Sequence, residues 1–93
     1  MWVILVYDIS TEDKEGQKRL NKARKIARKY LLHVQKSVFE GSIRPSALER
    51  LKAEMLSIID RRKDSLIIYS FDDMVNYKRE ILTEGEDPAS NIF

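Results

Sequence analysis

The chain opens with a continuous apolar run from Met1 to Tyr7, and this run ends abruptly at Asp8. β-Branched and aromatic side chains dominate the run, which is typical of a strand buried on both faces. We expect the strand to span about Trp2 to Tyr7, so that Asp8 lies where the chain leaves the core. Folds that combine helices with a sheet open their ligand crevices at such strand ends. The run therefore predicts an internal strand and places Asp8 in a position suited to chemistry.

Helical and extended patterns then follow one another. Ser10 or Thr11 is expected to cap a first helix. Residues 31–43 predict two short strands or one bent strand, and Pro45 suits the first turn of a second helix. Residues 65–71 form a second buried-strand pattern. The apolar positions of the two predicted helices are Leu20, Ala23, Ala27 and Tyr30, then Leu48, Leu51, Met55 and Ile58.

This order of elements favours the α+β class, as a ferredoxin-like βαββαβ sandwich with both helices on one face of the sheet. Residues 1–71 would form its core, and residues 72–93 an extra C-terminal strand or tail. That segment is rich in apolar side chains, so we expect it to dock onto a dimer mate or another partner. A homodimer would also enlarge the small core of a short chain. The apolar residues concerned are Met74, Val75, Tyr77, Ile81, Leu82, Ile92 and Phe93.

The composition excludes several classes of protein. With 93 residues, 43% hydrophobic and 34% charged, the chain predicts one globular domain. The absence of cysteine excludes disulfides and thiolate metal sites. The apolar start lacks the basic region of a signal peptide, and no segment approaches the length of a membrane span. We therefore expect a soluble, cytoplasmic protein with no membrane partner.

Positive charge is concentrated between Lys14 and Lys36, where Glu15 is the only acidic residue. An ordinary solvated helix face would mix both signs, so this excess favours a polyanion, most simply DNA or RNA. Arg24 and Arg28 form a second basic row at helical spacing. Contacts with phosphates would provide affinity but no choice of sequence. The predicted nucleic-acid-binding residues are Lys18, Arg19, Lys22, Lys25, Arg28 and Lys29.

The carboxylate of Asp8 allows two interpretations. It can cap the next helix or accept hydrogen bonds from loop amides, as Asp commonly does after a strand. Alternatively, it can bind Mg²⁺ or Mn²⁺, which prefer carboxylate oxygens and water. A symmetric dimer could supply two copies of Asp8 to one ion. Such an ion could activate water or stabilise the charge of a phosphodiester.

Other candidate residues carry weaker signals. His33 is the only histidine and could act as a general base, although a structural role is commoner. Tyr7 and Phe39 could stack on bases, although core packing is the usual role of such residues. Ser37 has no evident histidine and acid partners for nucleophilic catalysis. No phosphate-binding glycine loop, zinc-ligand spacing or dinucleotide fingerprint is present.

Two motifs on either side of the basic helix together resemble the CRISPR-associated protein two (Cas-two) family. They are Tyr7-Asp8-Ile9-Ser10 and Val34-Gln35-Lys36-Ser37-Val38-Phe39-Glu40-Gly41. The resemblance extends over nearly the whole chain, from the first strand to the tail. It implies a ferredoxin-like homodimer of the prokaryotic adaptive immune system, in which the last strand of each chain packs on the other protomer.

The resemblance also implies an activity. Asp8 would face its dimer mate and bind Mg²⁺ in a metal-dependent endonuclease acting on single-stranded RNA or double-stranded DNA. The family bridges two dimers of the Cas-one integrase during spacer acquisition, where it can serve as a scaffold. His33 stands where many relatives carry arginine, and Lys36 where many carry an aromatic residue. Activity-supporting roles are implied for Tyr7, Ser10, His33, Ser37 and Phe39.

Our leading hypothesis is a dimeric Mg²⁺-dependent endonuclease that works in spacer acquisition with the Cas-one integrase. The alternative is a non-catalytic adapter that binds DNA and bridges integrase dimers. A stand-alone toxin ribonuclease related to the family is a third hypothesis. A single-strand RNA-recognition module is disfavoured because the aromatic RNA-binding signature of such domains is missing.

Overall fold

The sheet and both helices lie within residues 1–72 and 78–83, which are the residues that the computed structural model describes. The elements follow the predicted order, and residues 31–43 form two strands rather than one bent strand. The second helix begins at Pro45, as its fixed backbone angle suits the first helical turn. The elements are β1 (Trp2–Asp8), α1 (Lys14–Tyr30), β2 (Leu32–Gln35), β3 (Val38–Ser42), α2 (Pro45–Ile58) and β4 (Ser65–Phe71).

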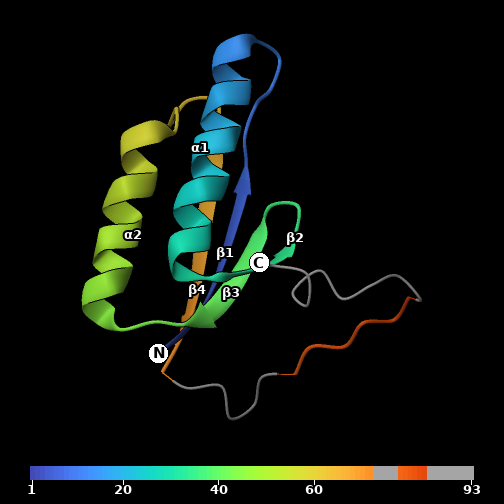
Figure 1. Cartoon of the computed structure of the whole chain (residues 1–93), viewed down its shortest axis with the longest axis vertical. Helices are drawn as coiled ribbons and strands as arrows, with labels where there is room; N and C mark the ends of the chain where they lie inside the picture. The colour runs from blue at the N-terminus through green and yellow to red at the C-terminus, as the bar shows by residue number, and fades with distance from the viewer. Residues whose placement is uncertain (73–77, 84–93) are drawn as a thin grey trace.

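The strands form one sheet in the order β2-β3-β1-β4, and every neighbouring pair is antiparallel. Both helices lie side by side against the same face of this sheet (Figure 1). The arrangement is the ferredoxin-like βαββαβ sandwich predicted from the sequence. Strand β1 is internal, since it pairs with β3 along one edge and with β4 along the other.

The core lies between the sheet and the helices. On β1 the residues Val3, Leu5 and Tyr7 point into it, because alternate residues of a strand face the same side. The helices contribute side chains at three- and four-residue spacing, which places them on one helix face. The other core residues are Ile9, Ala23, Ala27, Leu31, Phe39, Ile43, Leu48, Leu51 and Met55.

The expectation that β1 is buried on both faces was wrong for the single chain. Trp2, Ile4 and Val6 point to the face opposite the helices and are only partly buried. On β4 the side chains of that face are exposed: Ile67 to 44%, Tyr69 to 52% and Phe71 to 40%. The reason is topological, since both crossovers place their helices on one side of the antiparallel sheet, so that neither helix covers the other side. We call this surface the open sheet face.

Helix α1 is capped by Asp13. The prediction that Ser10 or Thr11 would cap this helix was therefore wrong. The Asp13 carboxylate accepts a hydrogen bond of 2.8 Å from the Gly16 N–H, and this bond holds the pKa of Asp13 below its usual value. The helix starts later than predicted because the backbone of Ser10 is already bonded to Asp64 and Arg19.

Part of the C-terminal prediction falls outside the described residues. Met74, Val75 and Tyr77 lie in the range 73–77, and Ile92 and Phe93 in the range 84–93. Among residues 78–83 the structure has no strand, and Ile81 and Leu82 are exposed. The docking role of residues 72–93 therefore stays a prediction. Neither described helix combines the length and the apolar character that crossing a membrane requires.

Gly16 allows helix α1 to approach the loop that follows β1. A Cβ atom added at Gly16 would lie 1.9 Å from the carbonyl oxygen of Ser10, a backbone atom that cannot rotate away. We expect Gly16→Ala to lower the free energy of unfolding by about 1–3 kcal/mol, as overpacking does in general. Urea unfolding would measure the change.

Gly41→Ala is the matched control for this substitution. Its Cβ would meet a side-chain carbon of Leu31 at 3.3 Å, and a leucine side chain can adjust. If Gly16→Ala were no more destabilising than Gly41→Ala, the close approach of α1 to Ser10 would not be a constraint on the fold.

Candidate functional site at the end of strand β1

The two sequence motifs meet in space at the end of β1. Leu5 lies opposite Phe39 in the ladder, and their neighbours Val6 and Val38 are also paired. Beyond the ladder, the Tyr7 N–H donates a hydrogen bond of 3.1 Å to the Ser37 carbonyl. Antiparallel pairing of β1 with β3 therefore brings Tyr7-Asp8 against the β2–β3 turn.

A cleft with a volume of about 490 Å³ opens at this junction. Strand β1, helix α1 and the β2–β3 turn all contribute to its wall, and the lining side chains include three cations and one carboxylate. The lining residues are Tyr7, Asp8, Ile9, Thr11, Leu20, Arg24, Arg28, His33, Lys36 and Ser37. A second cavity of about 560 Å³ adjoins it and shares His33, Lys36 and Ser37.

Asp8 is exposed at the rim of this cleft, as the last residue of β1 and opposite Ser65 of β4. Strand alternation assigns it to the open sheet face, together with Trp2, Ile4 and Val6. Within the described residues, no three His, Cys, Asp or Glu side chains gather closely enough to hold a metal ion. Among the residues that line the cleft, Asp8 is the only carboxylate. This donor set fits Mg²⁺, which keeps most of its water and needs only one or two carboxylates plus substrate phosphates.

Arg24 and Arg28 face the cleft from helix α1. They continue a row that begins at Leu20, because residues four apart share one side of a helix. Arg24 was recognised in the second basic row but was not included among the predicted nucleic-acid-binding residues. Its spacing from Arg28 was the signal in the sequence. What the sequence did not reveal is that this row, and not the Lys18 to Lys29 row, borders the cleft with Asp8.

His33 holds Arg28 in place. Its Nε2 lies 3.0 Å from the Lys36 carbonyl, which only accepts, and its Nδ1 lies 3.3 Å from Nη2 of Arg28, which only donates. In this arrangement Nε2 donates to the Lys36 carbonyl and Nδ1 accepts from Arg28. The ring also stacks on Phe39, with centroids 4.3 Å apart and planes at 6°. Both nitrogens are engaged, so this geometry favours a structural role for His33 over a general base.

Phe39 is fully buried beneath His33, and the centroids of the Phe39 and Tyr7 rings lie 5.9 Å apart. This environment makes Phe39 a core residue and leaves it no free face for a base. Tyr7 is also buried, and its hydroxyl has no hydrogen-bond partner among the described residues. Burial raises the pKa of Tyr7, while the charge of Arg24, the approach of its N–H donors to the hydroxyl oxygen and the charge of Arg28 oppose the rise. An unsatisfied buried donor costs about 1–3 kcal/mol.

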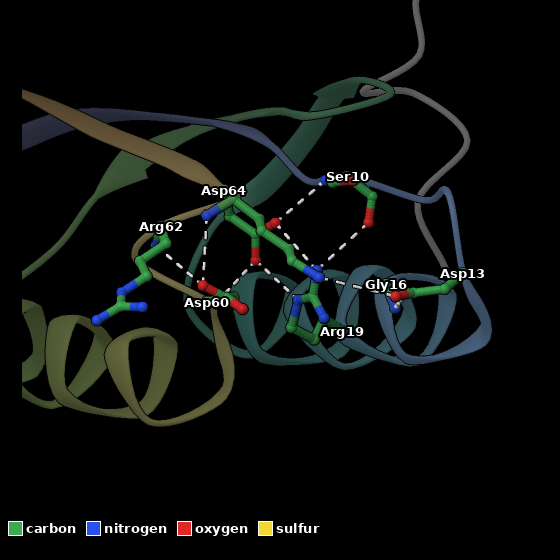
Figure 2. A network of polar contacts seen from close by, with 8 residues as sticks. Ser10, Asp13, Gly16, Arg19, Asp60, Arg62 and Asp64 are labelled. Atoms are coloured by element: carbon green, nitrogen blue, oxygen red, sulfur yellow. Dashed lines mark hydrogen bonds and ion pairs between the residues drawn. The ribbon is translucent and has the colours of Figure 1, made fainter.

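Asp64 anchors the loop that follows Asp8, as Figure 2 shows. Its fully buried carboxylate accepts from the Ser10 N–H at 3.1 Å and from the Asp60 N–H at 2.8 Å. Arg19 donates to both carboxylate oxygens, through Nε at 2.8 Å and Nη2 at 3.3 Å. The same Nη2 reaches the Ser10 carbonyl at 3.4 Å. The backbone beside Asp8 is thus tied to the α2–β4 loop.

The predicted basic residues divide into groups. Arg19 is committed to Asp64 and is 15% exposed, so its geometry serves the loop rather than a ligand. Lys29 pairs with Glu54, which also accepts a bond from Tyr30. Lys18 makes only an exposed pair with Glu15 at 3.6 Å, which contributes little. Lys22 and Lys25 are exposed, so they stay candidates for phosphate contact.

Comparison with known proteins assigns this architecture to a family. The profile described as CRISPR associated protein Cas2 matches residues 1–79. The chain belongs to the Cas2 family.

Individual Cas2 relatives match over nearly their full length. CRISPR-associated endoribonuclease Cas2 2 of Moorella thermoacetica is 53% identical over 91 residues, which are 98% of this chain and all of the relative. CRISPR-associated endonuclease Cas2 of Halalkalibacterium halodurans is 39% identical over 92 residues, covering 99% of this chain and 94% of the relative. The crystal structure of Streptococcus pyogenes Cas2 superposes with a TM-score of 0.75 at 33% identity, covering 87% of this chain and 99% of that one. The Cas2 resemblance predicted from the two motifs is thereby confirmed.

The pKa of Asp64 leads to a prediction about stability. Burial raises the pKa of this carboxyl, but the hydrogen bonds from Arg19, Asp60 and Ser10 outweigh burial and hold the pKa below its usual value. A carboxyl with a depressed pKa stabilises the fold above its unfolded pKa, and the contribution is lost as pH falls through the folded pKa. We expect Asp64→Asn to cost about 1–3 kcal/mol at neutral pH. The deficit should shrink as pH falls through the depressed pKa of Asp64, where the wild-type carboxylate also loses its charge.

Urea unfolding of both proteins across this pH range measures the effect. Glu49→Gln is the control, because Glu49 forms only an exposed pair with Lys52 at 3.5 Å. A deficit that stayed constant down to acid pH would contradict a role for the Asp64 charge.

Proposed function

We propose that this Cas2-family protein is a metal-dependent endonuclease that hydrolyses phosphodiester bonds in RNA or DNA. The observation that carries the proposal is an exposed carboxylate, Asp8, at the rim of a cleft lined by Arg24, Arg28 and Lys36. A hydrated cation and a polyanion can meet there. The names of two relatives support the class of reaction, endoribonuclease in Moorella thermoacetica and endonuclease in Halalkalibacterium halodurans.

In the proposed mechanism, Asp8 would hold Mg²⁺, with Mn²⁺ as a substitute, and the basic side chains would bind the strand. When bound there, the ion would supply positive charge able to lower the pKa of a coordinated water and to stabilise charge on the phosphodiester. Arg24 and Arg28 neutralise strand charge inside the cleft, while Lys22 and Lys25 extend the basic surface along α1. Asp64 and Arg19 keep the Asp8–Ser10 backbone at a constant position through the contacts described above.

Homodimerisation through the open sheet face would complete this site. Asp8 shares that face with Trp2, Ile4 and Val6, so face-to-face association would direct both copies of Asp8 into one interface. The exposed apolar side chains of β4 provide area for such an interface. Two carboxylates would then be available to one ion without a second acidic residue in the sequence.

A role in spacer acquisition is the finer part of the proposal. The dimer would work in the cytoplasm and bridge dimers of the Cas-one integrase while holding DNA. The cations of the cleft can contact DNA phosphates without any help from Asp8. They therefore favour DNA binding even in a protein that does not cleave. A non-catalytic adapter is therefore the second candidate function.

Replacing Asp8 separates these two functions. We expect Asp8→Asn to lower Mg²⁺-dependent cleavage by about 100-fold or more, because it removes the anionic ligand of the ion. Asp72→Asn is the matched control, since Asp72 follows β4 next to Phe71, which pairs with Trp2 at the far end of β1. Gel assays with labelled single-stranded RNA and duplex DNA, with Mg²⁺ or chelator, would measure the loss. Unchanged cleavage by Asp8→Asn would refute catalysis at this carboxylate, and wild-type DNA binding without cleavage would favour the adapter.

A charged residue on the open sheet face should prevent dimerisation. We expect Ile67→Glu to shift the protein to monomer, because a carboxylate would have to be buried in the apolar interface. Leu56→Glu is the control, because Leu56 is similarly exposed, at 41% against 44% for Ile67, but lies on α2. Sedimentation velocity over a concentration series would measure both. A dimer that tolerates Ile67→Glu would place the interface elsewhere.

A further inference from the structure

The cleft beside Asp8 contains a buried donor that has no acceptor. The Tyr7 side chain is 2% exposed, and its hydroxyl has no hydrogen-bond partner among the described residues. Arg24 is its charged neighbour in the cleft wall. A guanidinium only donates, so Arg24 cannot accept the Tyr7 proton even if it closes on the hydroxyl oxygen. Among the described residues, the Tyr7 hydroxyl proton therefore has no acceptor.

The cations of this cleft are also without acidic partners. Within residues 1–72 and 78–83, no carboxylate forms an ion pair with Arg24, Arg28 or Lys36. Other cations of α1 are paired in the same structure, as Arg19 is with Asp64 and Lys29 with Glu54. Helix α1 therefore has two kinds of cation. Arg19 and Lys29 are paired with carboxylates, whereas Arg24 and Arg28, which line the cleft, form no such pair among the described residues.

On the cleft side of α1, Arg28 lies within hydrogen-bond distance of His33. His33 accepts from it and is itself fixed by the Lys36 carbonyl and by stacking on Phe39. A side chain that is already oriented loses less entropy when it binds a ligand. The cleft volume of about 490 Å³ lies within the range of small-molecule pockets, so one nucleotide unit fits by size.

We propose that this cleft is a phosphate-binding pocket for the nucleic-acid strand, in which Tyr7 donates its hydroxyl proton to a non-bridging phosphate oxygen and Arg24 and Arg28 pair with the phosphate charge. A phosphate oxygen is an acceptor only, so it satisfies the Tyr7 hydroxyl and both guanidinium groups together. Because the hydroxyl is buried beside Arg24 in the free protein, the proposal requires the Arg24 side chain to turn from the hydroxyl towards the phosphate. The inference rests on the proposed function for its ligand, a nucleic acid, but not for catalysis. It assigns Tyr7 a polar contact with substrate and makes Arg24 a principal cation of the site.

Tyr7→Phe tests the proposal because it removes only the hydroxyl. Binding of a fluorescein-labelled single-stranded ten-nucleotide RNA, measured by anisotropy in chelator, should weaken roughly tenfold. Unfolding free energy without RNA should stay unchanged or rise, because the lost donor had no partner. If the hydroxyl had only a structural role, Tyr7→Phe would lower the free energy of unfolding and leave RNA affinity unchanged. That result would overturn the proposal.

Arg24→Gln tests the charge against a matched control. We expect RNA affinity to fall roughly tenfold and the dependence of log affinity on log salt to lose about one unit of slope. Arg50→Gln removes an exposed arginine from α2, and it should change affinity by less than about twofold because the distant charge is screened. Equal losses in the two variants would show only a bulk charge effect and would overturn the pocket.

Because chelator prevents metal-dependent cleavage, these binding results are independent of the outcome for Asp8. Weakened binding by Tyr7→Phe and Arg24→Gln would support the pocket even if Asp8→Asn still cleaved. Normal binding by both variants would overturn it even if catalysis at Asp8 were established. Repeating the titration with a DNA strand of the same sequence would show whether the phosphate belongs to RNA, DNA or both.

Discussion

The pleat of strand β1 is the constraint on which the rest of the site depends. Because β1 is hydrogen-bonded on both edges, its register cannot slip without disrupting two ladders at once. Successive residues must then face opposite sides of the sheet. Tyr7 is directed to the helix side, beneath Arg24, while Asp8 is directed to the open sheet face. Two adjacent residues thereby face two surfaces. Tyr7 is proposed to bind phosphate in the cleft, and Asp8 is proposed to bind a metal ion at a dimer interface.

The loop after β1 is controlled by a buried charge. Asp64 accepts hydrogen bonds from Arg19 and from the backbone of Ser10 and Asp60, which joins the end of β1 to the start of β4. The absence of a side chain at Gly16 lets α1 lie against the Ser10 carbonyl. These contacts explain why Arg19, although basic and on the same helix, contributes to the position of the site and not to its free positive charge. They also explain why the helix begins at Lys14, after Asp13.

Much of the fold could be predicted because it depends on local pattern. The apolar runs, the helical spacing of Leu48, Leu51 and Met55, and Pro45 at a helix start each reflect a preference of neighbouring residues. The cap was missed because Ser10, Thr11 and Asp13 are all good capping residues. In the structure the Ser10 backbone is bonded to Asp64, more than fifty residues away in the sequence, and the Asp13 side chain makes the cap. Local pattern contains no information about such a contact.

The sequence by itself determined the class of element in each segment, the ferredoxin-like order and the two motifs that identify the Cas2 family. It also determined that α1 is basic and that Asp8 ends a strand. Only the tertiary structure decided which cations are free, because pairing of Arg19 with Asp64 and of Lys29 with Glu54 joins residues distant in the chain. It also decided that Arg24 and Arg28 share a cleft with Asp8, and that both helices lie on the same face of the sheet and leave Ile67, Tyr69 and Phe71 partly exposed on the other. The physical reason is that burial and charge compensation depend on which surfaces meet, whereas hydrophobic periodicity records only that a surface of each element must be buried.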